Sequence, residues 1–280
     1  MALSDISLIE NYQSPKGKDV TFSISDPHNE PTIGVIDTMF DNSVYFSKWV
    51  EFKNMLDQQI QLSDKDYEHR TMVSSIIVDG PNLNPDLDDG CDRFKIKYFS
   101  VAKADKFSSF TVLRAIEEII KTNRDIKVWN LSLGSSMEIN SNFISPEAAL
   151  LDQLQYENDI IFITADTNKL KNSKIEKIGS PADSINSLVV NSVDFNNKLV
   201  DYSRKGLVLS FFLKPDVSYY GGDDSNKIRA CLPLGETWIS ETSFAAPWIT
   251  RKVAYFIEVL GFTKRVSKSS YNRFNHRLRE

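Results

Sequence analysis

The sequence predicts an α/β fold in which a mostly parallel central sheet has helices on both faces. Short apolar segments of strand length alternate along the chain with longer segments whose apolar residues recur every three or four positions. Composition agrees, because 41% of the 280 residues are hydrophobic and 25% are charged, which is typical of a globular chain and excludes a disordered one. One large α/β domain fits this length.

Five segments are predicted to form the strands of the sheet. Residues 32–36 are a short apolar run that ends at Asp37, which predicts a buried strand with an acid at its carboxyl end. Apolar or partly alternating runs predict the remaining strands at 94–101, 128–133, 160–164 and 187–193.

Helices are predicted between and after these strands, at 73–78, 110–121, 146–156 and 243–260. Ser108 or Ser109 is a candidate cap for the second of them. The third begins with Pro146, which suits the first turn of a helix, and Gly261 closes the last.

The two ends of the chain differ from its centre. Residues 1–31 are polar and punctuated by prolines and glycine, which predicts a loose N-terminal lead-in. Residues 262–280 are basic and lack an apolar helical pattern, which predicts a frayed C-terminal tail. The folded domain is therefore expected to span residues 32–261.

Charge and cysteine content exclude several classes of function. The 38 acids outnumber the 33 lysines and arginines, giving a formal charge of -5, which disfavours nucleic-acid binding. Cys91 and Cys231 are too far apart for the paired spacing of a zinc site, and two cysteines make no disulfide framework. We find no secretory signal and no run of about 20 apolar residues, so we expect a cytoplasmic protein that does not bind membranes.

The functional site is expected where parallel strands end, because such sheets bind their ligands beyond the carboxyl ends of the strands. Asp37 and Gly134 occupy such ends, and Asn168 follows another at a short distance. Serine catalysis also needs a histidine base that an acid orients. Of the three histidines, His28 and His276 fall in the predicted lead-in and tail, which leaves His69.

The candidate acid, base and nucleophile are Asp37, His69 and Ser243, in that chain order. The acid lies 32 residues before His69, and Ser243 lies 174 residues after it in the segment Glu-Thr-Ser-Phe-Ala-Ala-Pro. Each residue alone has a simpler interpretation. Asp37 could cap a turn, Ser243 could cap a helix, Asn168 could form an ordinary turn, and a lone histidine is more often structural than catalytic.

Together these segments resemble the three signatures of the subtilase family of serine peptidases, in which the order is Asp, His, Ser. Residues 128–134 resemble the family's strand that pairs with the substrate backbone, and residues 163–168 resemble the segment with its oxyanion-hole asparagine. Residues 214–222 resemble a further Lys-Pro-Asp-Val stretch. The resemblance covers roughly residues 32–260 and implies a three-layer subtilisin-like fold.

The resemblance also implies roles for the residues. Ser243 would attack the peptide carbonyl, His69 would accept its proton, and Asp37 would orient the imidazole. Asn168 would hold the oxyanion. An extended peptide would add as a strand to the segment Ser132, Leu133 and Gly134. The implied activity is that of a serine endopeptidase with a protein or peptide substrate and no organic cofactor.

A narrower resemblance concerns regulation. Some details are similar to a bacterial intracellular subgroup whose gene lies beside that of an AAA-type ATPase. Because no pro-segment of the secreted subtilases is recognised, we expect regulation by a partner, for which such an ATPase is the candidate.

Metal binding is not predicted. Some subtilases bind calcium, and Asp86, Asp88, Asp89 and Asp92 form an acidic cluster in a loop rich in proline and glycine. Their spacing matches no calcium loop, so a solvated loop is expected.

Three glycines of the family pattern are replaced in this chain. Arg70 follows the histidine, Glu241 stands two residues before the serine, and Thr167 precedes the asparagine, with Asp166 beside it. These charges favour an alternative function, a degenerate subtilase that binds peptides or a partner without cleaving. If His69 and Ser243 meet, Arg70 and Glu241 are expected either to pair across the cleft or to point to solvent.

Overall fold

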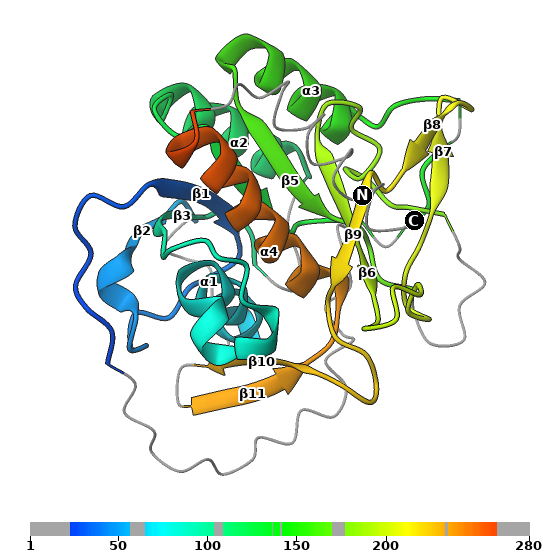
Figure 1. Cartoon of the computed structure of the whole chain (residues 1–280). Helices are drawn as coiled ribbons and strands as arrows, with labels where there is room; N and C mark the ends of the chain where they lie inside the picture. Colours follow the sequence, from blue (N-terminus) through cyan, green and yellow to red (C-terminus); the bar gives the residue numbers. More distant parts are fainter. Residues whose placement is uncertain are drawn as a thin grey trace.

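A sheet that is parallel at every pairing forms the middle layer of the molecule (Figure 1). The computed structural model describes residues 23–56, 65–103, 109–135, 137–140, 142–169, 177–232 and 235–261. Its seven strands lie in the order β2-β3-β1-β4-β5-β6-β9. They are β1 (Thr32–Asp37), β2 (Val50–Asn54), β3 (Lys95–Ser100), β4 (Val128–Leu131), β5 (Ile161–Ala165), β6 (Leu188–Val193) and β9 (Val217–Tyr220).

Two pairs of helices cover the two faces of the sheet. They are α1 (Lys65–Leu83), α2 (Ser109–Thr122), α3 (Pro146–Asn158) and α4 (Thr242–Ala254). Helices α1 and α4 pack together on one face, and α2 and α3 pack together on the other. Successive strand residues alternate between the two cores, since Ile33 and Val35 join the α1–α4 core whereas Ile36 joins the α2–α3 core. The predicted three-layer α/β fold is confirmed.

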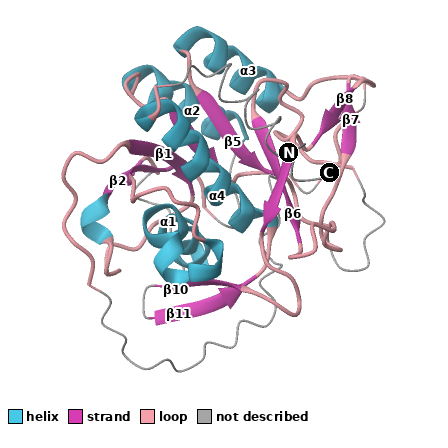
Figure 2. Cartoon of the chain, viewed as in Figure 1, coloured by secondary structure: helices cyan, strands magenta, loops and turns pink. Residues whose placement is uncertain are grey.

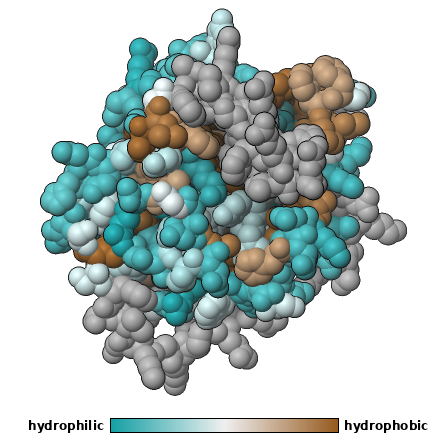
Figure 3. All heavy atoms as spheres, viewed as in Figure 1, coloured by the Kyte–Doolittle hydropathy of each residue, from teal (hydrophilic) through white to brown (hydrophobic). Residues whose placement is uncertain are grey.

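Two small antiparallel hairpins lie outside the central sheet. Strands β10 (Ile228–Leu232) and β11 (Gly235–Ile239) lie beside α1 (Figure 2). Strands β7 (Gly206–Val208) and β8 (Phe212–Lys214) form the second hairpin. Its exposed Leu207, Phe211 and Leu213 give one of the hydrophobic areas on an otherwise mainly hydrophilic face (Figure 3).

The structure also differs from the expected elements. Strands β2 and β9, at the two edges of the sheet, were not predicted, because each is short and only partly buried. The strand expected at 128–133 ends at Leu131, so residues 132–134 lie outside the sheet. The last helix changes after Ala254 into a π-helical turn, Tyr255–Val259. The expected tail at 262–280 lies outside the described residues.

Only glycine fits at position 34 in the middle of the sheet. A Cβ built on Gly34 lies 2.2 Å from Cε3 of Trp129, which is fully buried on the neighbouring strand β4. The indole therefore packs directly on the backbone of β1, three residues before Asp37. This contact brings β1 and β4 together at the point where both strands approach the candidate site.

No helix among the described residues has the length and apolar character needed to span a bilayer.

Replacing Gly34 with alanine should destabilise the fold by about 1–3 kcal/mol, because the added methyl group has to displace the Trp129 ring. This corresponds to a fall in the melting temperature of roughly 3–10 °C, measurable by circular dichroism. Gly206→Ala is the matched control, because a Cβ there meets its nearest atom at an ordinary 3.5 Å. Equal melting temperatures for the two variants would contradict the packing argument.

Candidate active site

The candidate catalytic residues converge at one edge of the sheet. Asp37 is the last residue of β1, at the carboxyl edge of the sheet. His69 lies near the start of α1, and Ser243 lies in the first turn of α4. The ring centroids of His69 and Phe244, the neighbour of Ser243, are 5.0 Å apart, so the starts of the two helices are in contact. Asp37, His69 and Ser243 are all buried.

Helix α4, which carries Ser243, is anchored by three polar contacts. The Thr250 hydroxyl donates to Asn130 Oδ1 on β4 at 2.9 Å. Arg251 is fully buried and donates to both carboxylate oxygens of Asp89, at 2.8 and 3.0 Å. At the helix start, the Thr242 hydroxyl donates to the carbonyl oxygen of Asp166 at 2.5 Å. Ser243 is therefore held by a helix that is tied to β4, to the loop after β5 and to the loop before β3.

Asp37 forms a buried ion pair with Arg70. Nε of Arg70 lies 2.6 Å from Asp37 Oδ1 and also donates to the Thr38 hydroxyl at 3.1 Å. The exposed fraction is 0% for the Asp37 side chain and 3% for that of Arg70. Burial raises the pKa of Asp37 above its ordinary value, and the positive charges of Arg70 and His69 oppose that shift. The guanidinium is thus the main charge that compensates this carboxylate.

His69 forms a hydrogen bond with Glu241. Its Nε2 lies 3.3 Å from Glu241 Oε2. Nδ1 of His69 and Oδ2 of Asp37 are both buried and have no hydrogen-bond partner among the described residues. In that part of the chain, no hydrogen bond joins His69 to Ser243 or to Asp37. The structure brings the three residues together without closing the hydrogen-bonded chain that serine catalysis uses.

The expected pair between Arg70 and Glu241 is wrong, and so is the alternative that both side chains point to solvent. Each charge is instead paired with a candidate catalytic residue, Arg70 with Asp37 and Glu241 with His69. The physical reason is the helical geometry of α1. Consecutive residues on an α-helix point about 100° apart, so Arg70 can face β1 while His69 faces α4.

Asn168 lies beside the first turn of α4. Its Oδ1 accepts a hydrogen bond from the Thr242 backbone N–H at 3.1 Å, and the Thr242 hydroxyl oxygen lies 2.9 Å from the same atom. Because Oδ1 is engaged by Thr242, the amide NH₂ group is the donor that Asn168 could offer to an oxyanion. Asp166 does not place a full charge nearby at neutral pH. Burial raises its pKa to about 8, although the Thr167 backbone N–H and the Arg204 guanidinium oppose the shift.

Thr167 fills the space between two backbone segments at the site. Its methyl carbon Cγ2 lies 3.1 Å from a Cβ built on Gly134, and its hydroxyl accepts a hydrogen bond from the Gly179 N–H at 2.8 Å. Ser135 N donates to Ser180 O at 2.6 Å, and Ile139 N donates to Ile178 O at 3.0 Å. Little room is therefore left between Gly134 and Thr167.

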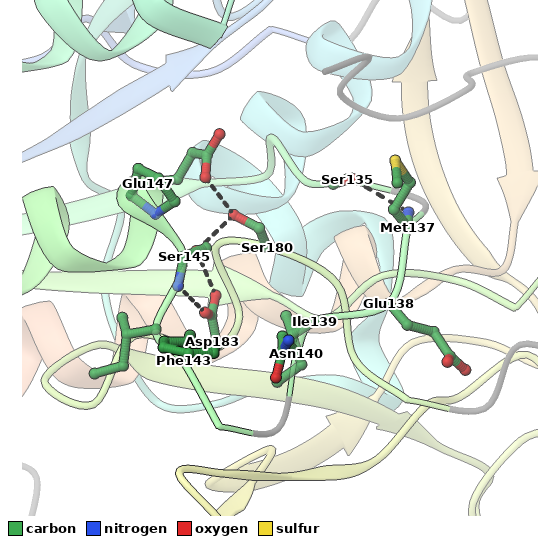
Figure 4. Close-up of a pocket in the computed structure, with 12 residues that line it drawn as sticks. Ser135, Met137, Glu138, Ile139, Asn140, Phe143, Ser145, Glu147, Ser180 and Asp183 are labelled. Carbon is green, nitrogen blue, oxygen red and sulfur yellow. Dashed lines mark hydrogen bonds between the residues drawn. The ribbon is translucent and has the colours of Figure 1, made fainter.

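A cavity of about 280 Å³ opens beside this region, at the start of α3 (Figure 4). It combines apolar side chains such as Ile139 and Phe143 with three acids, Glu138, Glu147 and Asp183. Figure 4 shows Glu147 directed to Ser180, and Asp183 directed to Ser145. Because these serines already donate to the two buried acids, the acids support the start of α3.

The acidic loop has a structural role that the sequence did not indicate. Asp89 is not solvated as expected, because its carboxylate is buried against Arg251 of α4. Among the described residues, no group of three or more His, Cys, Asp or Glu side chains is arranged to hold a metal ion. The ion pair between Asp89 and Arg251 joins residues that are far apart in sequence, so it leaves no local pattern in the sequence.

Replacing Arg70 with alanine should cost about 3–5 kcal/mol of unfolding free energy, because it leaves the Asp37 carboxylate buried without its partner. Arg70→Lys should recover part of this loss, because it restores a positive charge. Urea denaturation measures both. Arg229→Ala is the control, because its ion pair with Glu236 is partly exposed and should contribute under about 1 kcal/mol. Similar losses in Arg70→Ala and Arg229→Ala would contradict the importance assigned to the buried pair.

Comparison with known structures agrees with the fold. The structure is similar to the epidermin leader peptide processing serine protease from Staphylococcus aureus, with a TM-score of 0.65, 17% identity, and coverage of 88% of this chain and 69% of that one. A cold-adapted subtilisin-like serine proteinase has a TM-score of 0.61 and 19% identity, covering 86% of this chain and 81% of that one. The prenylagaramide maturation protease has a TM-score of 0.61 and 20% identity, covering 85% and 80%.

At these identities the three structures show a shared fold. A search among curated proteins gives no significant match. The model of the subtilase family, however, matches residues 28–268, which is most of the chain. The chain therefore belongs to the subtilase family.

Proposed function

We propose that this protein is a serine endopeptidase that cleaves peptide bonds through an acyl-enzyme intermediate. Ser243 is the nucleophile, His69 the general base and later the general acid, and Asp37 the group that orients the imidazole. The Asn168 amide and the Ser243 backbone N–H stabilise the oxyanion, helped by the N-terminal dipole of α4.

The observation that carries this proposal is the meeting of β1, α1 and α4 at one edge of the sheet. Three side chains that are 32 and 174 residues apart in sequence are buried there together, with Asn168 bonded to the start of α4. The unpartnered Asp37 Oδ2 and His69 Nδ1 are the two atoms that the catalytic hydrogen bond between acid and base would join. The family match supports the same chemistry.

The substrate is a polypeptide that adds as a strand to Ser132–Gly134. Asn168 and Ser243 must both face the carbonyl that is attacked, so the residue contributing that carbonyl lies over Gly134 and Thr167. The Thr167 methyl group lies 3.1 Å from a Cβ built on Gly134, so a substrate side chain directed into the protein there would meet it. The proposed substrate therefore carries glycine or alanine immediately before the cleaved bond.

A second function, a subtilase that binds peptides without cleaving them, is favoured by one observation. The acid and the base each have a charged partner other than the catalytic one, Arg70 and Glu241. If these pairs are permanent, the site binds a strand but cannot activate Ser243.

Regulation by an AAA-type ATPase and a cytoplasmic location stay predictions from the sequence.

A fluorophosphonate probe separates the two functions, because it labels only an activated serine. The wild-type protein should be labelled, and Ser243→Ala should not. Asn168→Ala should be labelled about 10²–10³-fold more slowly, since one oxyanion donor is lost. Ser225→Ala, a change in an exposed loop, is the control and should match the wild type. Complete absence of labelling in both the folded wild-type protein and its Glu241→Gly variant would favour the binding function.

The substrate proposal is tested with peptides that differ only in the residue before the cleaved bond. Wild-type protein should cleave after glycine or alanine at least about 10-fold faster than after leucine, because one or two misplaced methylenes cost roughly that factor. Thr167→Ala should reduce this preference, because it removes the methyl group that fills the space. Mass spectrometry of the products gives the rates. Equal cleavage after leucine and alanine by the wild-type protein would contradict the role of Thr167.

A further inference from the structure

Glu241 is the feature of this site that the proposed chemistry does not use. It precedes α4 and lies two residues before Ser243, and its side chain makes no capping bond to the helix. The carboxylate is directed instead to Nε2 of His69, 3.3 Å away. In serine catalysis this nitrogen must present a lone pair to the serine hydroxyl. The Glu241 carboxylate is thus bonded to the nitrogen atom that has to accept the proton of Ser243.

The protonation of His69 follows from this contact. A carboxylate accepts hydrogen bonds and donates none, so Nε2 has to carry a proton when it is bonded to Glu241. A protonated Nε2 cannot accept the proton of Ser243. While the contact persists, the imidazole is either the wrong neutral tautomer or a cation, and neither form acts as the base.

Arg70 and Glu241, the two charged residues that replace glycines of the family pattern, differ in how firmly their side chains are held. Arg70 is nearly inaccessible to solvent, whereas the Glu241 side chain is 24% exposed. The backbone of Glu241 is fixed by its N–H, which donates to Gly221 O at 3.0 Å. A side-chain rotation can therefore carry the carboxylate into water without moving α4. The 3.3 Å separation is long for a charge-assisted bond, so the contact is weak enough to be reversible.

We propose that Glu241 is a built-in inhibitory carboxylate, which holds Nε2 of His69 in the resting protein and leaves it when the peptidase becomes active. This inference rests on the proposed serine peptidase function. In the active arrangement the Glu241 side chain is in solvent, Nε2 accepts from Ser243, and Nδ1 donates to Asp37 Oδ2. Arg70 stays on Asp37 Oδ1 in both arrangements, so it is a positioning residue for the acid.

The test measures the rate at which fluorophosphonate labels Ser243 in the full chain. Glu241→Gln removes the charge at nearly constant shape, and Glu241→Gly removes the side chain. Both should be labelled about 5- to 30-fold faster than the wild type, which corresponds to the loss of a contact worth one or two kcal/mol. Glu236→Gln is the matched control, because it neutralises another partly exposed acid in an ion pair, with Arg229, away from the site. It should be labelled at the wild-type rate.

The remaining outcomes overturn the inference in distinguishable ways. If both Glu241 variants are labelled no faster than the wild-type protein, Glu241 does not inhibit, although the peptidase function stands. No labelling of any folded variant means that release of Glu241 yields no reactive serine, so both the inference and the peptidase function fail. Circular dichroism establishes that each variant is folded, and Ser243→Ala in the Glu241→Gln background establishes that the label is on Ser243.

Discussion

The buried ion pair between Arg70 and Asp37 is the interaction on which the arrangement of this site depends. It joins α1 to the end of β1, the central strand next to β4. Because Arg70 is fixed against Asp37 and Thr38, the rotation of α1 about its axis is fixed as well. His69, one residue earlier and about 100° around the helix, is then directed toward α4. The same pair occupies Asp37 Oδ1 and leaves Oδ2 as the oxygen that can orient an imidazole.

The opposite side of the site is set by α4, which is held independently of α1's ion pair. Arg251 donates hydrogen bonds to Asp89 and to the backbone carbonyls of Ile77 and Cys91, so the far part of α4 is tied to the second half of α1 and to the loop that follows it. Thr242 ties the near end to the segment of Asn168. With both helices fixed, the state of the site depends on side-chain positions. A rotation of one residue, Glu241, is then enough to exchange one hydrogen-bonding pattern for another.

The sequence predicted the buried parts of this fold better than its edges. The five predicted strands are the interior strands of the sheet, where continuous apolar runs reflect burial on both faces. The edge strands β2 and β9 lack that signal, because one side of each is partly exposed. Asp37 and Asn168 were located because they follow predicted strands, whereas His69 was located by elimination among three histidines and Ser243 by its resemblance to a family signature.

The pairing of charges could not be predicted in the same way. The sequence showed that Arg70 and Glu241 replace glycines, and that a buried charge needs a partner. It did not show which partner, because the choice depends on directions that differ by about 100° between neighbouring helical residues. The pairing of Arg251 with Asp89 has the same character, since it joins positions 162 residues apart. Such contacts follow from packing in three dimensions and produce no recognisable spacing of residues in the sequence.

The most direct test of the central claim is the protonation state of the His69 ring nitrogens, measured by ¹⁵N nuclear magnetic resonance near neutral pH. The chain has three histidines, so the His69 signals are assigned by their loss in His69→Gln. If Glu241 holds Nε2 of His69 in the resting protein, Nε2 carries a proton in the wild-type protein and loses it in Glu241→Gly. A bare Nε2 with the proton on Nδ1 alone, in the wild-type protein, would contradict the account.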